Sequence, residues 1–341
     1  MNLRTLPLEL TVLFYFASYV PNVVITRLVS TQPNASLGRP LTGLETLPAT
    51  LLMNLVLTGA FIWISGWYRD AHQLKVGRRS VPVPTRYTVL SGIGSALVLF
   101  TVPMSLTFTN VSIPFILLLM RGDILLIAPL VDLLFRRRVR WWSWAALVIV
   151  GCALTLVVHQ RGGFHLPPLA VATVVLYTIG YFLRLAVMTH IGKKGDPALV
   201  RQYFVEEKLV ALPLSIVALA GVSMLRLGNQ SGDLLRGFTM VWTDPVFWPL
   251  LGIAMTLTVI SVFAAIILLN PNENSYCVPL ERSSSLLAGL FAAYILYWFW
   301  GLPSPTHTEL LGAAMLVGAI LLLTLAPRYS RGSGLLKNHH G

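Results

Sequence analysis

Arg121 and Asp123 are the side chains most able to do chemistry, because both lie near the middle of an apolar stretch, 113–135. A stretch of this length can cross about 30 Å of hydrocarbon, and a charge at mid-depth costs several kcal/mol unless it faces protein or water. The two lie about 200° apart around a helix and are not expected to share a face. We predict that Arg121 faces a polar cavity and binds substrate, with a structural ion pair as the alternative. Asp123 is predicted to form an ion pair, with Arg184 or Lys208 as candidate partners.

A second charged group, formed by Tyr203, Glu206, Glu207 and Lys208, opens the apolar stretch 199–225. Tyr203 and Glu207 are four residues apart and therefore share one stripe of a helix. Two acids and a lysine so close to the membrane can form a proton-coupling or substrate site, with Tyr203 as a substrate contact. They can equally form an interfacial ion-pair cluster, and the sequence leaves both interpretations open.

The third group surrounds Arg282, which follows Glu281 and precedes three serines. We predict that Arg282 binds substrate and that Glu281 serves in coupling or in an ion pair. Arg282 lies about six residues from the end of its apolar stretch, so snorkelling to the membrane surface is the alternative. Ser285 is a candidate ligand contact, although serines also let helices pack closely.

Two further polar residues lie inside apolar stretches. Asn22 follows Pro21, so it marks a kink whose freed carbonyl is satisfied locally, and a substrate contact is the second interpretation. Arg184 lies near the end of its stretch and is interpreted as a snorkelling residue.

The charges in the interior of the apolar stretches, away from their ends, balance. The bases are Arg121, Arg184, Lys208 and Arg282, and the acids are Asp123, Glu206, Glu207 and Glu281. If the acids pair among themselves and with Lys208 and Arg184, two arginines remain for an anionic or zwitterionic solute.

The elements that position these residues are predicted to be membrane helices. Hydrophobic residues make up 55% of the 341 residues and charged residues 11%, which is typical of a multi-pass membrane protein. We predict ten spans, at 6–28, 44–66, 87–108, 111–135, 141–159, 167–190, 199–225, 245–269, 276–300 and 308–326. The whole chain, 1–341, is then one transmembrane domain with a cytoplasmic tail at 327–341.

The basic residues predict the orientation of these spans. In this arrangement 16 of the 25 basic residues lie in segments on one side of the membrane and 5 on the other, and the run 136–140 is a topology anchor on the first side. Both termini are therefore predicted to be cytoplasmic, and no nucleic-acid partner is expected.

Internal repetition is predicted from the even division into five and five spans. Arg282 follows Arg121 by 161 positions, and Gly318 follows Gly151 by 167. Five spans per half would place the second half upside down. The expected fold is therefore all-α, with ten transmembrane helices arranged as two inverted five-helix repeats, 6–159 and 167–326.

Three short stretches resemble the drug/metabolite transporter superfamily, closest in style to its triose-phosphate and nucleotide-sugar translocator branch. They are the run from Asn110 through Arg121 to the Gly-ended helix at Gly151, the run Tyr19-Val-Pro-Asn22-Val-Val-Ile-Thr-Arg27, and Arg282 followed by small residues. The chain can also be described as EamA-like in this respect. The resemblance implies a ten-helix fold with a central cavity and alternating access. It implies that Arg282 occupies a basic substrate-contacting position. The sequence lacks the Lys-Arg pair of phosphate translocators in its ninth span.

Together these features predict a secondary transporter, acting as an antiporter on a small anionic or zwitterionic metabolite of the sugar-phosphate or nucleotide-sugar type. The main alternative is a proton-coupled exporter of amino acids or small amphiphilic compounds. A multi-pass membrane enzyme ranks below both, because the sequence holds no HExxH motif, nucleophile elbow, CxxC or glycine-rich phosphate loop. No metal or cofactor is expected.

The expected partners are a small-molecule substrate and the lipid bilayer, with a homodimer left open. Sequons at Asn34 and Asn229 fit a Golgi or endoplasmic-reticulum membrane. The excess of arginine over lysine fits a GC-rich bacterium, and a bacterial inner membrane is preferred.

Overall fold

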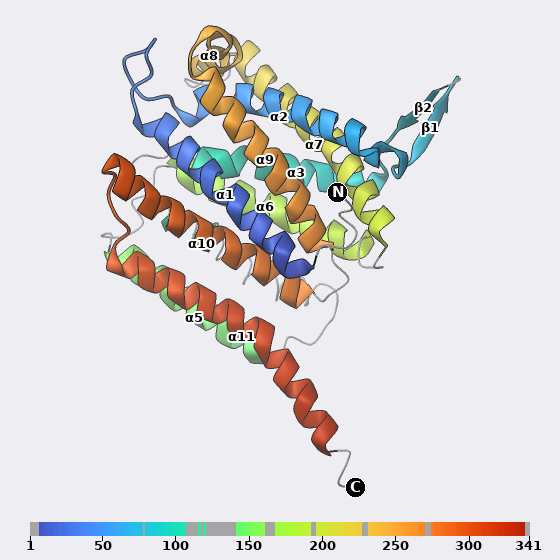
Figure 1. The fold of residues 1–341 in the computed structure, drawn as a ribbon, viewed down its shortest axis with the longest axis vertical. Helices are drawn as coiled ribbons and strands as arrows, with labels where there is room; N and C mark the ends of the chain where they lie inside the picture. Colours follow the sequence, from blue (N-terminus) through green and yellow to red (C-terminus); the bar gives the residue numbers. More distant parts are fainter. Residues whose placement is uncertain are drawn as a thin grey trace.

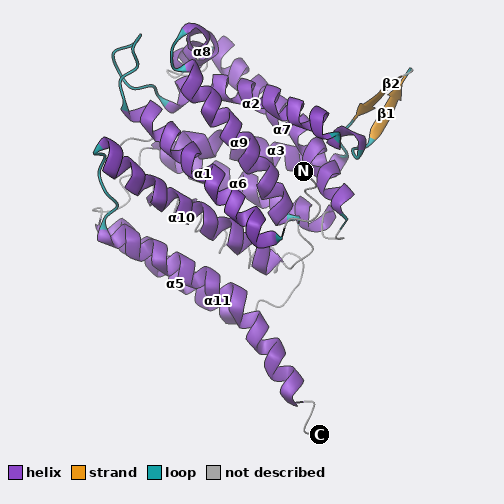
Figure 2. Ribbon diagram, in the orientation of Figure 1, coloured by secondary structure: helices purple, strands orange, loops and turns teal. Residues whose placement is uncertain are grey.

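The computed structural model describes residues 7–77, 79–106, 115–116, 119–120, 141–160, 168–191, 196–226, 231–269 and 274–337. This part of the chain is almost entirely helical (Figure 1, Figure 2). The long helices are α1 (Leu8–Thr31), α2 (Gly43–Ser65), α3 (Arg86–Leu106), α5 (Trp141–Gln160), α6 (Pro168–Ile191), α7 (Pro197–Met224), α9 (Phe247–Leu268), α10 (Asn274–Trp300) and α11 (His307–Lys337). The shorter elements are η2 (Trp67–Arg69), the antiparallel strands β1 (Gln73–Val76) and β2 (Arg79–Pro82), α8 (Ser231–Thr239) and η3 (Met240–Thr243).

In the described residues, 6 helices are long and apolar enough to cross a membrane by length and composition. They are Leu8–Thr31, Gly43–Ser65, Ala170–Met188, Pro197–Met224, Phe247–Leu268 and Leu280–Trp300. The protein is therefore an all-α, multi-pass membrane protein.

Helices lie at the predicted ranges wherever the structure describes them. The fourth range, 111–135, lies outside the described residues except for 115–116 and 119–120. α11 runs past the predicted end at 326 to Lys337, so the expected tail begins as helix. Two of the intervals between predicted spans contain secondary structure: 67–86 contains the β-hairpin, and 226–244 contains α8. The number of membrane crossings stays a prediction.

Local signals explain several helix ends. Thr42 and Glu45 form a capping box at the start of α2, and Gly66 ends it with φ 73°, which glycine adopts without strain. Asp196 accepts a hydrogen bond from Ala198 N at 2.8 Å, and Pro197 follows at the first helical position of α7.

Glycines allow α3 to approach two neighbours closely. A Cβ on Gly94 would lie 2.5 Å from the Gly180 carbonyl oxygen of α6, and a Cβ on Gly180 would lie 2.6 Å from the Gly94 oxygen. A Cβ on Gly92 would lie 2.5 Å from the Cβ of Val210 in α7. Small residues at these crossings let helix backbones meet, as is common in membranes.

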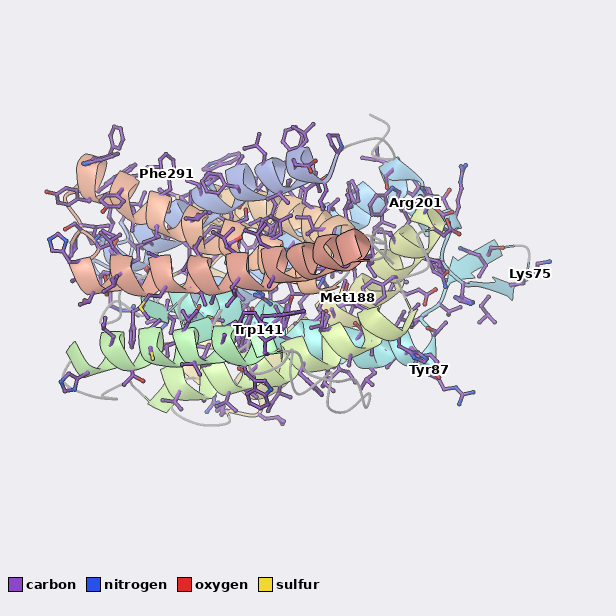
Figure 3. All side chains as sticks on the ribbon, turned by 90° about the horizontal axis from the view of Figure 1, so that it is seen from below. Lys75, Tyr87, Trp141, Met188, Arg201 and Phe291 are labelled. Carbon is purple, nitrogen blue, oxygen red and sulfur yellow. The ribbon has the colours of Figure 1, made fainter. Side chains whose placement is uncertain are left out.

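The helices surround one central region. α1 packs on α9 and α10, α3 packs on α6 and α7, and α2 crosses α7, α8 and α9. α5 and α11 pair with each other at one edge, and α11 also contacts α10 (Figure 1). Side chains fill the space between the helices, while the hairpin with Lys75 projects beyond one end (Figure 3).

Candidate functional site

A cavity of about 80 Å³ lies midway along the helices. This exceeds the roughly 10–15 Å³ that one water molecule needs. In the described part of the chain, side chains from six helices line it: α1, α3, α6, α7, α9 and α10. The polar residues among them are Tyr15, Tyr19, Asn22, Ser95, Tyr177, Tyr181, Arg184, Lys208, Ser261, Glu281 and Arg282.

Arg282 lines this cavity and is only 1% exposed. Its Nη1 donates a hydrogen bond to the Tyr177 hydroxyl, and its guanidinium carbon lies 3.6 Å from the centroid of the Tyr181 ring. Its Nε lies 3.2 Å from Oε2 of Glu281. Nη2 has no hydrogen-bond partner among the described residues. Arg282 therefore lies at the cavity and does not snorkel, while its substrate contact stays a prediction.

Arg184 and Glu207 form a buried ion pair beside the cavity. Arg184 Nε lies 2.8 Å from Glu207 Oε1, and Ser95 donates a hydrogen bond to the same carboxylate. Arg184 is 8% exposed and Glu207 is fully buried. The interpretation of Arg184 as a snorkelling residue is wrong, because its side chain is buried and pairs with Glu207 of α7 instead of reaching the membrane surface.

Lys208 differs from the two arginines. Its side chain lines the cavity, is 4% exposed and has its Nζ 5.6 Å from the centroid of the Phe204 ring. No hydrogen bond or ion pair joins it to another described residue. The sequence analysis supposed that buried acids pair with both Lys208 and Arg184. Among the described residues, Arg184 has such an ion pair, with Glu207, and Lys208 has none.

Glu206 lies on another face of α7 and is bound to the segment between α2 and α3. It accepts hydrogen bonds from His72 N at 3.0 Å, Thr85 N at 3.2 Å and Thr88 Oγ1 at 2.8 Å. Gln202 donates another at 3.0 Å, and His72 Nδ1 lies 2.7 Å away. The structure thus separates Glu206 from Glu207, because neighbouring residues of a helix point about 100° apart.

The other predicted site residues have local partners. Asn22 Nδ2 donates to the Ile253 carbonyl at 3.2 Å and to Thr256 Oγ1 at 2.9 Å, which joins α1 to α9 at the cavity wall. Tyr203 is buried and shares a hydrogen bond with Ser91. Ser285 donates to the Arg282 carbonyl at 2.9 Å within α10 and does not line the cavity.

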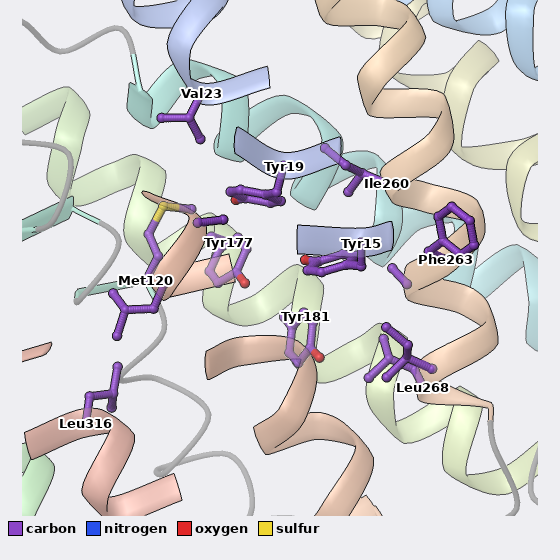
Figure 4. Packing of buried hydrophobic residues seen from close by; sticks show 14 of the residues in the cluster. Tyr15, Tyr19, Val23, Met120, Tyr177, Tyr181, Ile260, Phe263, Leu268 and Leu316 are labelled. Atoms are coloured by element: carbon purple, nitrogen blue, oxygen red, sulfur yellow. The ribbon is translucent and has the colours of Figure 1, made fainter. Parts of the chain in front are cut away.

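Four tyrosines that the sequence analysis did not select surround the site. Tyr15 and Tyr19 come from α1, Tyr177 and Tyr181 come from α6, and all four lie in the buried cluster of Figure 4. The Tyr15 hydroxyl donates to Glu281 Oε1 at 2.6 Å. A signal was present, because Tyr-x₃-Tyr occurs in both stretches at a separation of 162 positions.

Arg121 and Asp123 lie outside the described residues, so their predicted roles stay predictions. Within the described residues, no group of three or more His, Cys, Asp or Glu side chains could hold a metal ion.

Asp244 lies outside the apolar helices, in the turn before α9. Partial burial raises the pKa of its carboxyl, but hydrogen bonds from Ser36, Val246 N and Asn34 outweigh this and lower the pKa below its ordinary value. Asn34 Nδ2 donates to this carboxylate at 2.9 Å, so the amide of the first sequon is already engaged.

The apolar helices and the buried polar cavity define a helical, multi-pass membrane protein with an internal polar site. No family model matches the sequence, and no curated protein matches it. Among the solved structures, 22 chains match. One of them, described as "Crystal structure of protein", has a TM-score of 0.55 and 16% sequence identity over 94% of this chain and 98% of that chain. This similarity extends to the fold alone.

Proposed function

We propose that the protein is a secondary transporter that moves a small anionic or zwitterionic metabolite by alternating access. The observation that carries this proposal is the charge of the cavity. Among the residues that the structure describes, three buried cations, Arg184, Lys208 and Arg282, face two carboxylates, Glu207 and Glu281. Arg282 Nη2 has no acceptor among the described residues, and the Lys208 side chain lines the cavity, so both can donate to a phosphate or carboxylate group. An intramembrane charge of this kind marks a solute path by default.

The proposed fold has ten membrane helices in two inverted repeats, with α1, α2, α3 and α5 corresponding to α6, α7, α9 and α11. The helix contacts support this correspondence. The contact of α3 with α6 matches that of α9 with α1, and the contact of α3 with α7 matches that of α9 with α2. A repeat boundary at the central cavity is the usual location of a transporter site.

The proposed orientation places both termini and the hairpin in the cytoplasm. The support is the basic residues around the hairpin, at Arg69, Lys75, Arg79 and Arg86. A bacterial inner membrane remains the preferred location.

The first test is a thermal-shift panel on detergent-purified protein with sugar phosphates, nucleoside monophosphates, nucleotide sugars, amino acids and cationic amphiphiles. A ligand at 100 times its Kd should stabilise the folded state by about 2.7 kcal/mol. Solutes that stabilise the protein are then loaded into proteoliposomes, and uptake of the labelled solute is measured with and without internal solute. Uptake that depends on internal anionic solute supports the proposal. Stabilisation by cations or neutral amphiphiles alone would refute it.

Glu281 favours a second candidate, a proton-coupled exporter, because its carboxylate lines the cavity and contacts both Arg282 and Tyr15. In that case a pH gradient should drive uptake, and Glu281→Gln should abolish the response to the gradient. Uptake that ignores the gradient excludes this candidate.

A further inference from the structure

A buried glutamate near the start of α2, Glu45, binds the connection that follows α7. Its side chain is 1% exposed and accepts two hydrogen bonds from Arg39, at 2.6 and 2.9 Å. Arg236 of α8 adds an ion pair at 2.9 Å, and Thr42 N donates at 2.9 Å. α8 also lies directly against the Glu45 backbone, since a Cβ on Gly237 would be 2.5 Å from its carbonyl oxygen. We name these residues the Glu45 cluster.

A buried glutamate of α7, Glu206, binds the connection that follows α2. Its five contacts, described above, reach His72 before the hairpin, Thr85 after it and Thr88 in the first turn of α3. Arg201 reinforces this attachment through an ion pair with Asp70 at 2.5 Å. We name these residues the Glu206 cluster.

The two clusters are reciprocal. Glu206 follows Glu45 by 161 positions, and each glutamate holds the segment that leads out of the other's helix. α2 and α7 pack together, and α8, which follows the end of α7, lies at the start of α2. The helices therefore run antiparallel, and the clusters lie at opposite ends, separated by roughly 30 Å at 1.5 Å per residue. Figure 1 shows α8 and the hairpin at opposite ends of α2.

Each held segment leads directly into a cavity helix. The hairpin continues into α3, which contributes Ser95 to the cavity, and α8 leads to α9, which contributes Ser261. When α3 or α9 moves away from α2 and α7 to open the cavity at one end, the segment that leads into it moves as well. Such movement breaks the cluster at that end and leaves the other intact.

We propose that the Glu45 cluster and the Glu206 cluster are the two gates of the transport cycle, one at each face of the membrane; both clusters are formed in this structure. This proposal rests on the transport function proposed above. Release of the Glu45 cluster opens the cavity at the α8 end, and release of the Glu206 cluster opens it at the hairpin end.

Cysteine labelling tests this proposal without a substrate. Ser261→Cys serves as the cavity reporter, in a chain whose native Cys152 and Cys277 are replaced by serine. A membrane-impermeant maleimide is added to vesicles of each orientation, and Lys75→Cys in separate vesicles identifies those that expose the hairpin end. Glu45→Gln should raise the labelling rate at least fivefold from the α8 end alone. Glu206→Gln should do so from the hairpin end alone.

The controls separate gate release from general loosening. Glu309→Gln changes another buried capping glutamate, which accepts a hydrogen bond from Thr306 N at the start of α11, and should leave both rates unchanged. Arg236→Gln and His72→Ala alter half-exposed cluster members and should reproduce the one-sided effects without threatening the fold.

Equal increases from both ends, or no increase in any of the four cluster variants, would overturn the gate assignment. If labelling increases from one side only but the protein transports none of the tested solutes, the result counts against the proposed function. The assignment of the two clusters as gates would then be retained. Measured transport with unchanged labelling would reject the gates alone.

Discussion

Replacing Lys208 with methionine should remove most of the anion affinity and leave the fold intact. The two side chains are similar in length, so the change deletes a charge and little volume. Lys208 is 4% exposed and forms no ion pair with another described residue, so its ammonium bears a cost of burial. Its loss also leaves Glu207 paired with Arg184 at 2.8 Å. We therefore expect a Tm equal to or above that of the wild type.

The expected loss of affinity follows from one hydrogen bond. A hydrogen bond to a charged group contributes about 1.5–3 kcal/mol, which corresponds to roughly a 10- to 150-fold increase in Kd. Isothermal titration with the anionic solute found in the thermal-shift panel measures this change. Lys75→Met, on the exposed hairpin, is the matched control and should bind like the wild type. Wild-type affinity in Lys208→Met, or a Tm several degrees lower, would refute the assignment of Lys208 as a free cavity cation.

Three further changes test the packing and the charges. Gly180→Ala should destabilise the fold by about 1–3 kcal/mol and lower the Tm, because the new Cβ would lie 2.6 Å from a carbonyl oxygen of α3. The control is Gly151→Ala, whose new Cβ meets nothing within 4 Å and should leave the Tm unchanged. Arg184→Gln should cost about 3–5 kcal/mol in thermal unfolding because it leaves Glu207 charged and buried, and Glu207→Gln in the same chain should restore most of the loss; a double variant as unstable as the single one would contradict the pairing. The carboxyl of Asp244 has a lower pKa in the folded protein than its unfolded pKa of about 4, so it stabilises the fold fully above pH 4. This stabilisation is lost as the pH falls through the lower, folded pKa. The acid dependence of Tm should therefore flatten in Asp244→Asn.

The helices could be predicted because their signal is local. Apolar runs of about 20 residues, interrupted by basic turns, already specify membrane helices. The predicted ranges coincide with described helices such as α5 and α9 to within a few residues. The hairpin and α8 were not predicted, because their pairing and docking depend on contacts with Glu206 and Glu45, which are distant in sequence.

The site could be predicted in part. Charges inside apolar stretches drew attention to Arg282 and Glu207, and both lie at or beside the cavity. Arg184 was misjudged because its distance from a helix end says nothing about which way that face turns. Tyr15 and Tyr181 were passed over because aromatic residues are ordinary in apolar helices, although their repeated spacing was visible in the sequence.

The sequence by itself determined that this protein crosses the membrane, because a run of apolar residues must bury its surface in lipid and satisfy its backbone within a helix. It also determined which helices carry charges. Only the tertiary structure decided that Arg184 pairs with Glu207, that Lys208 faces the cavity without a described ion pair, and that Glu206 holds the hairpin. The reason is physical: the cost or benefit of a buried charge depends on what lies within about 4 Å of it, and these neighbours come from helices far apart in the chain.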